Sequence, residues 1–296
     1  MNLLKKIIKK IKFIVESYFL FFFYIFDYYK SKKIYNEPSV CGFYQCYKQP
    51  KSVIATLASF RKIYNTSSVY LFCDEGDDMS HIASHFNCKY EYISKGHNLG
   101  FYFISKEELL SWLKRFLFAA QDSKEDFVMV IENDTRIYKK VKKLKFDFNG
   151  IKSNHHLGKE TTLFLKTRNN SIPRYINNIY YGGCGGALIN RNFIVNNFSN
   201  LKNLDFAIDE LLPYIKRQFG EKFPIDVCLA ALVIYFGGTI GQYLGYAETG
   251  PFRFTEILML KYKFRPLLGR IEVLHNDKSL YNVPLSEEEN RIFLGK

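Results

Sequence analysis

The feature that most constrains the fold is a regular alternation of apolar runs and helical patterns between residues 39 and 134. Apolar runs typical of strands cover 39–46, 67–74, 88–94 and 126–134, and segments with apolar residues at helical spacing separate them, at 50–64, 78–86 and 105–121. Strands joined through helices run parallel and lie in one sheet. We therefore predict an α/β protein with a mostly parallel central sheet flanked by helices.

Acidic residues follow two of these strands. Asp74 and Glu75 follow one, and Glu132-Asn133-Asp134 follows the run 126–131. Ligands of open α/β sheets gather beyond the carboxyl ends of the strands. Carboxylates at positions i and i+2 share a face and can reach one hard cation such as Mg²⁺ or Mn²⁺. The sequence therefore predicts a metal site at Glu132 and Asp134, with a solvated acidic turn as the plain alternative.

Several common functional motifs are absent from the sequence. No G-x-G-x-x-G follows the first strand and no G-x-x-x-x-G-K-[ST] occurs, which argues against a dinucleotide-dependent oxidoreductase and a P-loop NTPase. The six cysteines form no Cys-x-x-Cys pair, so a zinc site is not indicated and reduced core cysteines are favoured.

The formal charge of +13 in 296 residues is concentrated near the N-terminus. Residues 1–36 hold eight lysines against two acidic residues, around apolar residues at helical spacing and an aromatic run. We predict a basic amphipathic and aromatic segment that associates with a membrane through residues 1–30, on its cytoplasmic face. Whether residues 13–29 span the membrane or lie on it stays open, as do a helix packed on the domain and a cleaved signal.

A second basic stretch, at 136–145, has two interpretations. It forms a solvated face, or an electropositive rim near the metal site that attracts a nucleotide-sugar or an acidic membrane. A basic chain can also bind nucleic acid, but the sequence contains no zinc finger, RNP-like motif or other recognition module. Nucleic-acid binding is therefore kept only as an alternative.

Several of these segments together resemble the GT-A glycosyltransferases, which act on nucleotide-diphospho-sugars and carry a D-x-D metal motif on a Rossmann-like sheet. The likeness covers residues 39–277. It is carried by Tyr44–Tyr47 with Pro50, VYLFCDEGDD (69–78), GHNLGFYF (96–103), FVMVIENDTRI (127–137), YYGGCGGALINRNFI (180–194), FPIDVCLAAL (223–232) and LHND (274–277). The nearest type is the family-2-like enzymes of viral or bacterial surface-glycan pathways. The chain departs from the family pattern at Glu132, which replaces the first aspartate, and at Asp226, which stands without an acidic neighbour.

The resemblance implies roles for named side chains. The nucleotide-sugar donor would be held by Tyr44, Tyr47, Asp74, Glu75, Asn98 and Asn133, and Mn²⁺ or Mg²⁺ by Glu132, Asp134 and His275. Asp226 would be the base of an inverting reaction, which is favoured over a retaining one, and Gly183, Gly185, Gly186 and Arg191 would line the acceptor side. Each has a plain alternative, such as a helix cap for Asp74, a helix-dipole partner for Asp226, a surface histidine for His275 and a tight turn for the glycines.

The predicted organisation therefore has two parts. Residues 1–36 form the membrane-associating segment, and 37–296 form a GT-A domain with a nucleotide-sugar-binding half (37–135) and an acceptor-binding half (136–296). The predicted function is metal-dependent transfer of a sugar from a nucleotide-sugar to a glycan or lipid-linked acceptor. A catalytically inactive membrane-associated relative is the remaining alternative.

Overall fold

The computed structural model describes most of the chain from residue 32 onward. The described residues are 32–93, 102–150, 156–170, 185–241, 245–248 and 271–295, with 8, 11, 172, 179 and 243 standing singly between them. The predicted membrane-associating segment therefore lies almost wholly outside the described residues, as do Asn98 and Gly183. Of the helices that are described, none combines the length and the apolar character needed to cross a membrane.

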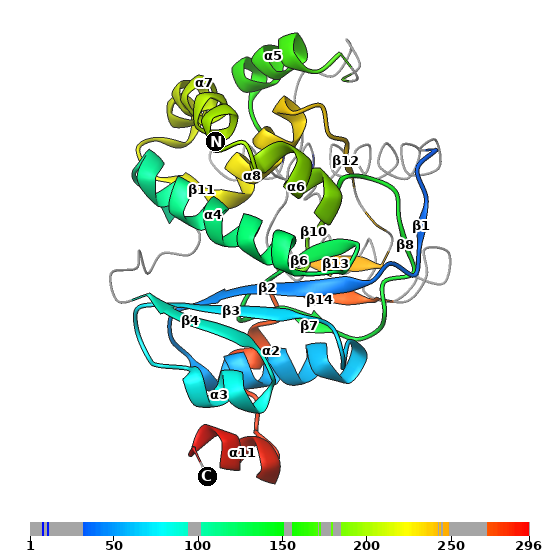
Figure 1. Ribbon diagram of the computed structural model, residues 1–296, viewed down its shortest axis with the longest axis vertical. Helices are drawn as coiled ribbons and strands as arrows, with labels where there is room; N and C mark the ends of the chain where they lie inside the picture. The colour runs from blue at the N-terminus through cyan, green and yellow to red at the C-terminus, as the bar shows by residue number, and fades with distance from the viewer. Residues whose placement is uncertain are drawn as a thin grey trace.

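A central sheet organises the described residues (Figure 1). Its seven strands lie in the order β12 (Ile240–Gly241), β9 (Phe148–Asn149), β10 (Leu188–Asn190), β6 (Phe127–Ile131), β2 (Val40–Cys46), β3 (Val69–Asp74) and β4 (Lys89–Ile93). Within this described sheet, β10 runs antiparallel to both neighbours and every other pair is parallel. The predicted fold class, a mostly parallel α/β sheet flanked by helices, is confirmed.

Helices cover both faces of the sheet (Figure 1). One face carries α2 (Pro50–Ile63), α3 (Ser80–His85) and α11 (Glu287–Phe293). The other carries α4 (Lys106–Asp122), α6 (Arg191–Phe198), α7 (Leu201–Phe219) and α8 (Ile225–Tyr235), with α5 (Lys159–Arg168) beyond them. Four strands and three helices between residues 40 and 131 lie where the sequence predicts them, with ends shifted by a few residues.

Short strand pairs and a 3₁₀ helix complete the described fold. These are β1 (Tyr35–Asn36) with β8 (Lys143–Leu144), β11 (Phe223–Pro224) with β5 (Tyr102–Phe103), β13 (Tyr246–Glu248) with β14 (Val273–His275) and β7 (Arg136–Ile137), and η1 (Lys278–Asn282). The β7–β14 pair matters most, because it brings a late segment of the chain beside the end of β6.

Side chains alternate between two cores along the central strands. On β2, Phe43 packs edge-on against Trp112 and Phe116 of α4, with ring centroids 5.0 and 5.2 Å away. The next residue, Tyr44, belongs to the core on the α2 side. Because successive strand side chains point to opposite faces, a continuous apolar strand fills both cores, and this explains why the runs predicted from sequence are unbroken.

Four of the six predicted core cysteines lie inside these cores, whereas Cys88 is half-buried at the margin of the core on the α2 side and Cys184 lies outside the described residues. Cys41, Cys46, Cys73 and Cys228 are buried free thiols of the described residues. Burial raises the pKa of Cys41 to about 12, so this thiol stays protonated and packs as a small apolar side chain.

Candidate functional site

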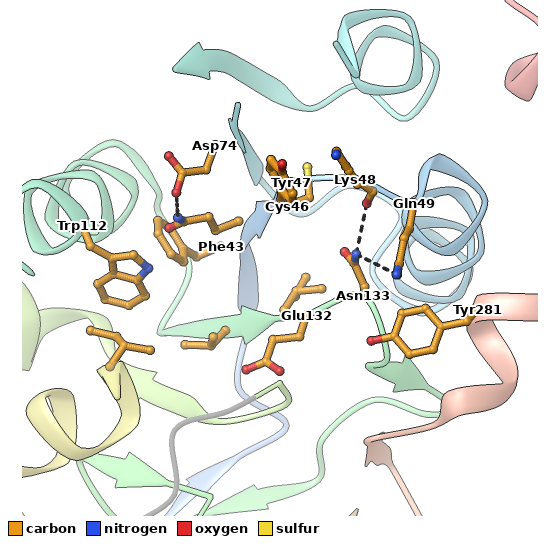
Figure 2. A pocket seen from close by; sticks show the side chains of 14 residues that line it. Phe43, Cys46, Tyr47, Lys48, Gln49, Asp74, Trp112, Glu132, Asn133 and Tyr281 are labelled. Carbon is orange, nitrogen blue, oxygen red and sulfur yellow. Dashed lines mark hydrogen bonds between the residues drawn. The ribbon is translucent and has the colours of Figure 1, made fainter. Parts of the chain in front are cut away.

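A pocket opens beyond the carboxyl ends of β2, β3 and β6, the edge at which a parallel sheet binds ligands. Figure 2 shows the side chains that line it. They are Phe43, Gln45, Cys46, Tyr47, Lys48, Gln49, Asp74, Trp112, Val130, Ile131, Glu132, Asn133, Ile225 and Tyr281. Aromatic rings and polar groups therefore share one cavity, which is the composition of a site for an aromatic, polar ligand.

Beside this pocket, Glu132, Asp134 and His275 form a cluster whose ligand atoms all lie within 4.8 Å of one another. The His275 Nε2 atom lies 3.1 Å from Glu132 Oε2 and 3.4 Å from Asp134 Oδ1. The first two residues follow β6, and His275 ends β14, which pairs with β7 just beyond Asp134. The structure thus brings together the three ligands that were predicted from sequence, and Glu132 also lines the pocket.

The donor set of this cluster fits a divalent cation. Two ligand atoms bound to one Mg²⁺ at about 2.1 Å can be at most about 4.2 Å apart, and the two distances from His275 Nε2 satisfy that limit. Carboxylate oxygens with one imidazole nitrogen are ligands that Mg²⁺ and Mn²⁺ accept. Glu132 and Asp134 would supply the negative charge and His275 a neutral nitrogen.

The electrostatics around Asp134 favour its ionised form. Burial raises the pKa of Asp134. Its hydrogen bond to His275 and the charges of His275 and Lys278 lower the pKa by more than burial raises it, so the pKa lies well below the usual value. The Lys278 ammonium contacts Asp134 Oδ2, and the Tyr281 hydroxyl donates to the same oxygen at 3.3 Å. These two residues of η1 were missed by sequence reasoning, since no motif marks them.

Gly185 lies directly over the cluster. A Cβ added to this glycine would stand 1.9 Å from Thr135 Oγ1, 2.8 Å from His275 Cδ2 and 3.2 Å from Glu132 Cβ. Only a residue without a side chain permits that approach. The predicted acceptor-side Gly185 therefore packs directly against the cluster of Glu132, Asp134 and His275. The next residue, Gly186, has a φ of 91°.

The turn that carries the two carboxylates is held from α2 and β2. The backbone oxygen of Asn133 accepts hydrogen bonds from Ser52 and, at 3.1 Å, from Thr56. Its side-chain oxygen accepts from the Tyr44 hydroxyl. Its side-chain nitrogen donates to Lys48 O at 3.2 Å (Figure 2). Tyr44 is fully buried and does not line the pocket, so it supports this turn from behind.

The other end of the pocket combines polar and aromatic groups. Gln45 donates to Asp74 Oδ2 at 2.8 Å and accepts from Arg115 at 3.4 Å. Tyr47 and Trp112 line the same cavity, and Trp112 is the only tryptophan of the chain. The predicted Asp74 and Tyr47 are therefore pocket residues, whereas Gln45 and Arg115 were not predicted, because β2 and α4 meet only in the fold.

Two further predicted residues lie at the margin of this pocket. Glu75 adopts a φ of 60° just after β3, in the left-handed region that is uncommon for residues other than glycine. Its carbonyl oxygen accepts from Cys73 Sγ at 3.2 Å. Asp226 stands in the first turn of α8, next to Ile225, which lines the pocket.

The predicted acceptor-side Arg191 lies at the opposite edge of the sheet. Its Nε donates to Ala120 O at 2.8 Å, and its backbone nitrogen donates to Asp126 O, just before β6 begins. The reason is strand direction: β10 runs antiparallel to β6, so Arg191 at its carboxyl end lies at the amino end of β6. The structure therefore does not bring Arg191 together with the other predicted site residues.

The basic stretch at 136–145 also leads away from the cluster. Arg136 stays close to the site and pairs with Asp277 at 2.7 Å. Leu144, however, pairs with Tyr35 of β1, whose ring contacts Phe127 at the amino end of β6 with centroids 5.0 Å apart. The far end of this stretch, at Lys143 and Leu144, therefore leads toward the opposite edge of the sheet, while Arg136 at its start stays beside the cluster.

Comparisons with known proteins add remote structural similarities. No protein-family model matches the chain, and no curated protein matches its sequence. The chain is similar to the galactosyltransferase LgtC in complex with donor and acceptor sugar analogs, at 10% identity and a TM-score of 0.46 over 86% of this chain and 99% of that one. An active-site mutant of LgtC gives 12% identity and 0.46 over 86% and 94%. The apo form of the glycosyltransferase GlyE from Streptococcus pneumoniae TIGR4 gives 12% and 0.44 over 87% and 60%.

TM-scores this low do not establish a shared activity. The function of this chain therefore has to be argued from its own side chains and their geometry.

Proposed function

We propose that this chain is a metal-dependent glycosyltransferase that moves a sugar from a nucleotide-sugar donor to a glycan or lipid-linked acceptor. The observation that carries the proposal is the cluster of Glu132, Asp134 and His275, with ligand atoms within 4.8 Å of one another, at the side of a pocket with aromatic walls. A cation site next to an aromatic pocket suits a ligand that joins a diphosphate to a nucleobase.

Positive charge is needed where the diphosphate would lie. Mn²⁺ or Mg²⁺ bound by the cluster would act as a Lewis acid that neutralises the departing diphosphate. The chain itself supplies Lys278, whose ammonium contacts Asp134 and whose side chain is 63% exposed. An exposed ammonium beside the cluster can move to a phosphate oxygen without breaking the fold. Lys278 is therefore proposed as a diphosphate-binding residue.

The nucleoside would occupy the end of the pocket between Trp112 and Tyr47. Stacking on an aromatic ring is tolerant of base identity, since every base has a π-face. Asp74 and Gln45 form a fixed hydrogen-bonded pair there, which can bind hydroxyl or amide groups of a ligand. This part of the proposal assigns nucleoside contact to Asp74 and Tyr47, in agreement with the sequence prediction.

The base of the reaction is proposed to be Asp226. It stands in the first turn of α8, one residue from Ile225, which lines the pocket. A carboxylate within reach of an acceptor hydroxyl can accept its proton, and the reaction would then invert the anomeric centre. An inverting reaction on a glycan or glycolipid is therefore proposed, of the kind used in bacterial or viral surface-glycan synthesis, with the enzyme held at the cytoplasmic face of a membrane by residues 1–30.

The proposal is tested by exchanging the carboxylates for their amides. Glu132→Gln and Asp134→Asn keep side-chain size, and Glu107→Gln on the exposed first turn of α4 is a matched control. Binding of a panel of nucleotide-sugars in the presence of Mn²⁺ is first measured by Trp112 fluorescence. Hydrolysis of the donor that binds is then measured for each variant.

We expect the two site variants to lose Mn²⁺-dependent hydrolysis by about a hundredfold or more, the scale on which removed transition-state charge stabilisation acts. The Glu107→Gln variant should keep it. Hydrolysis that is unchanged in both site variants, or that needs no divalent cation in the wild-type protein, would remove the metal role.

A further inference from the structure

Two lysine-rich stretches that are far apart in the sequence lie side by side in the fold. Strand β1 pairs with β8, with Tyr35 opposite Leu144 and Asn36 opposite Lys143. The backbone nitrogen of Glu37 donates to Lys142 O at 2.8 Å, which extends the contact by one residue. Residues 35–37 and 142–144 therefore join the stretches 32–37 and 138–145 at the surface.

The charge of these two stretches is strongly positive. They contain seven lysines and one acidic residue, Glu37. Lys33 is engaged with the buried Asp147 at 2.9 Å, and Lys145 is buried. The exposed lysines that remain are Lys32, Lys140, Lys142 and Lys143. We call these four, with the two apolar residues named next, the lysine face.

Exposed apolar side chains accompany these lysines. Ile34 is 51% exposed and Tyr138 is 44% exposed. Ile34 precedes the β1 residue that pairs with β8, and Tyr138 precedes Lys139 and Lys140 on the loop that leads into β8. A surface that interleaves lysine with an aliphatic and an aromatic side chain matches the interface of a lipid bilayer, where lysine stems lie along apolar groups and the ammonium reaches the headgroups.

We propose that the lysine face docks onto an anionic membrane surface. Polybasic segments bind anionic headgroups by about 1 kcal/mol for each lysine near the surface. Nucleic acid is the less suitable partner, because the face has no arginine for bidentate phosphate or base contacts and no recognition module. In sequence, the face begins within the last residues of the segment 1–36 that is predicted to associate with a membrane, so both would meet the same bilayer.

The position of the face has a consequence for the pocket. Tyr35 of β1 contacts Phe127 at the amino end of β6, whereas the pocket lies beyond the carboxyl end of the same strand. Docking through the lysine face therefore leaves the pocket open. The inference does not depend on the proposed enzyme activity, since membrane binding and nucleotide binding use different edges of the sheet.

The test is co-sedimentation of the full-length chain with vesicles of equal parts phosphatidylglycerol and phosphatidylcholine, compared with pure phosphatidylcholine. The test variant combines Lys140→Gln, Lys142→Gln and Lys143→Gln. Its matched control combines Lys114→Gln, Lys202→Gln and Lys222→Gln, which removes the same charge from exposed positions on the α4 and α7 layer. Urea unfolding of both variants, with midpoints close to that of the wild-type chain, shows that each is folded.

We expect the test variant to partition about a hundredfold more weakly onto the anionic vesicles, since each of its three lysines contributes about fivefold. The control should partition within about twofold of the wild-type chain, and Ile34→Ser should weaken binding even at high salt, where the electrostatic part is screened. Equal weakening of test and control variants would overturn the proposal, because net charge alone would then explain the binding. So would unchanged partitioning of the test variant, or displacement of bound vesicles by short duplex DNA or RNA that binds through the same lysines.

Discussion

The hydroxyl of Tyr44 donates a 2.7 Å hydrogen bond to the side-chain oxygen of Asn133, and so links the centre of the sheet to the middle of the turn that carries Glu132 and Asp134. Asn133 separates Glu132 from Asp134. Its side-chain nitrogen donates to Lys48 O in the loop after β2, at 3.2 Å. The side-chain amide of Asn133 therefore connects the loop after β2 to the turn that carries both carboxylates. Its oxygen and its nitrogen both form hydrogen bonds to other residues of the protein.

Removing the Tyr44 hydroxyl should disturb the metal site as well as the fold. Tyr44→Phe keeps the buried ring but leaves Asn133 without this donor, which should lower the free energy of unfolding by about 1–2 kcal/mol. Loss of a group that orients a metal ligand typically weakens metal binding by about tenfold or more. Titration of Mn²⁺ in the absence of nucleotide measures the second effect, and urea unfolding measures the first.

Tyr70→Phe is the matched control for that variant. Tyr70 is also fully buried, and its hydroxyl donates to Asp122 Oδ2 at 2.7 Å, in a different part of the sheet. We expect a similar loss of stability with unchanged Mn²⁺ affinity. If both tyrosine variants weaken Mn²⁺ binding equally, the Tyr44 hydroxyl acts through general stability and not through the turn.

A methyl group at Gly185 should damage the metal cluster. In Gly185→Ala the new Cβ would meet Thr135 Oγ1 at 1.9 Å and His275 Cδ2 at 2.8 Å, so the backbone or His275 must move. We expect Mn²⁺ affinity to fall by about ten- to a hundredfold, as for other changes in the groups that support metal ligands. Isothermal titration calorimetry of the purified protein measures this directly.

Gly220→Ala separates that effect from backbone strain. Gly220 follows α7 with a φ of 84°, and a Cβ there would meet no atom within 4 Å. Alanine in this backbone conformation, with a φ of 84° and a ψ of −167°, should cost about 1–3 kcal/mol of stability, with no change in Mn²⁺ affinity. If Gly185→Ala binds Mn²⁺ as tightly as the wild-type protein, the backbone at residue 185 can move away from His275 without weakening metal binding.

The strands and helices of the first half were predictable because the spacing of apolar residues along the chain follows from which side chains are buried. A continuous apolar run such as Phe127–Ile131 has one interpretation in an α/β chain, and the carboxylates that follow it must then lie at the ligand-binding edge. His275 was found only through a resemblance at the end of the chain. His275 lies beside Glu132 because β14 pairs with β7, and no local sequence pattern predicts that pairing.

The residues that sequence reasoning missed or misplaced share a physical reason. Lys278, Gln45 and Arg115 acquire their roles from contacts between elements that are distant in sequence. Arg191 was assigned to the acceptor side through the family resemblance, but the antiparallel direction of β10 places it at the far edge of the sheet. Strand direction leaves no trace in a short apolar pattern, so this error could not be avoided from sequence alone.

Asp226 gives a prediction that separates catalysis from binding. Asp226→Asn keeps the side-chain shape in the first turn of α8 and removes the proton acceptor. Donor binding, measured by quenching of Trp112, should stay unchanged, while sugar transfer should fall by about 10²–10⁴-fold, the usual contribution of a general base. A loss of donor binding in this variant would instead assign Asp226 to the donor site, and unchanged transfer would leave it as a helix-dipole partner.

Glu272 should make the stability of the fold depend on pH. Burial raises the pKa of this carboxyl group to about 7, against the lowering effects of a hydrogen bond from the Lys142 backbone and the charges of Lys142 and Lys139. A folded pKa above the unfolded one means that the folded state binds the proton more tightly. The stabilisation is therefore fully present below the unfolded pKa of about 4.3 and is lost as the pH rises through about 7.

The size of this effect is on the order of 4 kcal/mol at most, since each unit of pKa difference corresponds to about 1.4 kcal/mol. Urea unfolding of the wild-type protein and of Glu272→Gln, at several pH values between about 4.5 and 8, tests it. Glutamine keeps an oxygen for the Lys142 backbone nitrogen, which donates to Glu272 Oε1 at 3.2 Å, and it cannot ionise. The difference in unfolding free energy between the two proteins should therefore move in favour of glutamine as the pH rises. A difference that stays constant over this range would mean that Glu272 ionises as readily in the folded protein as in the unfolded chain.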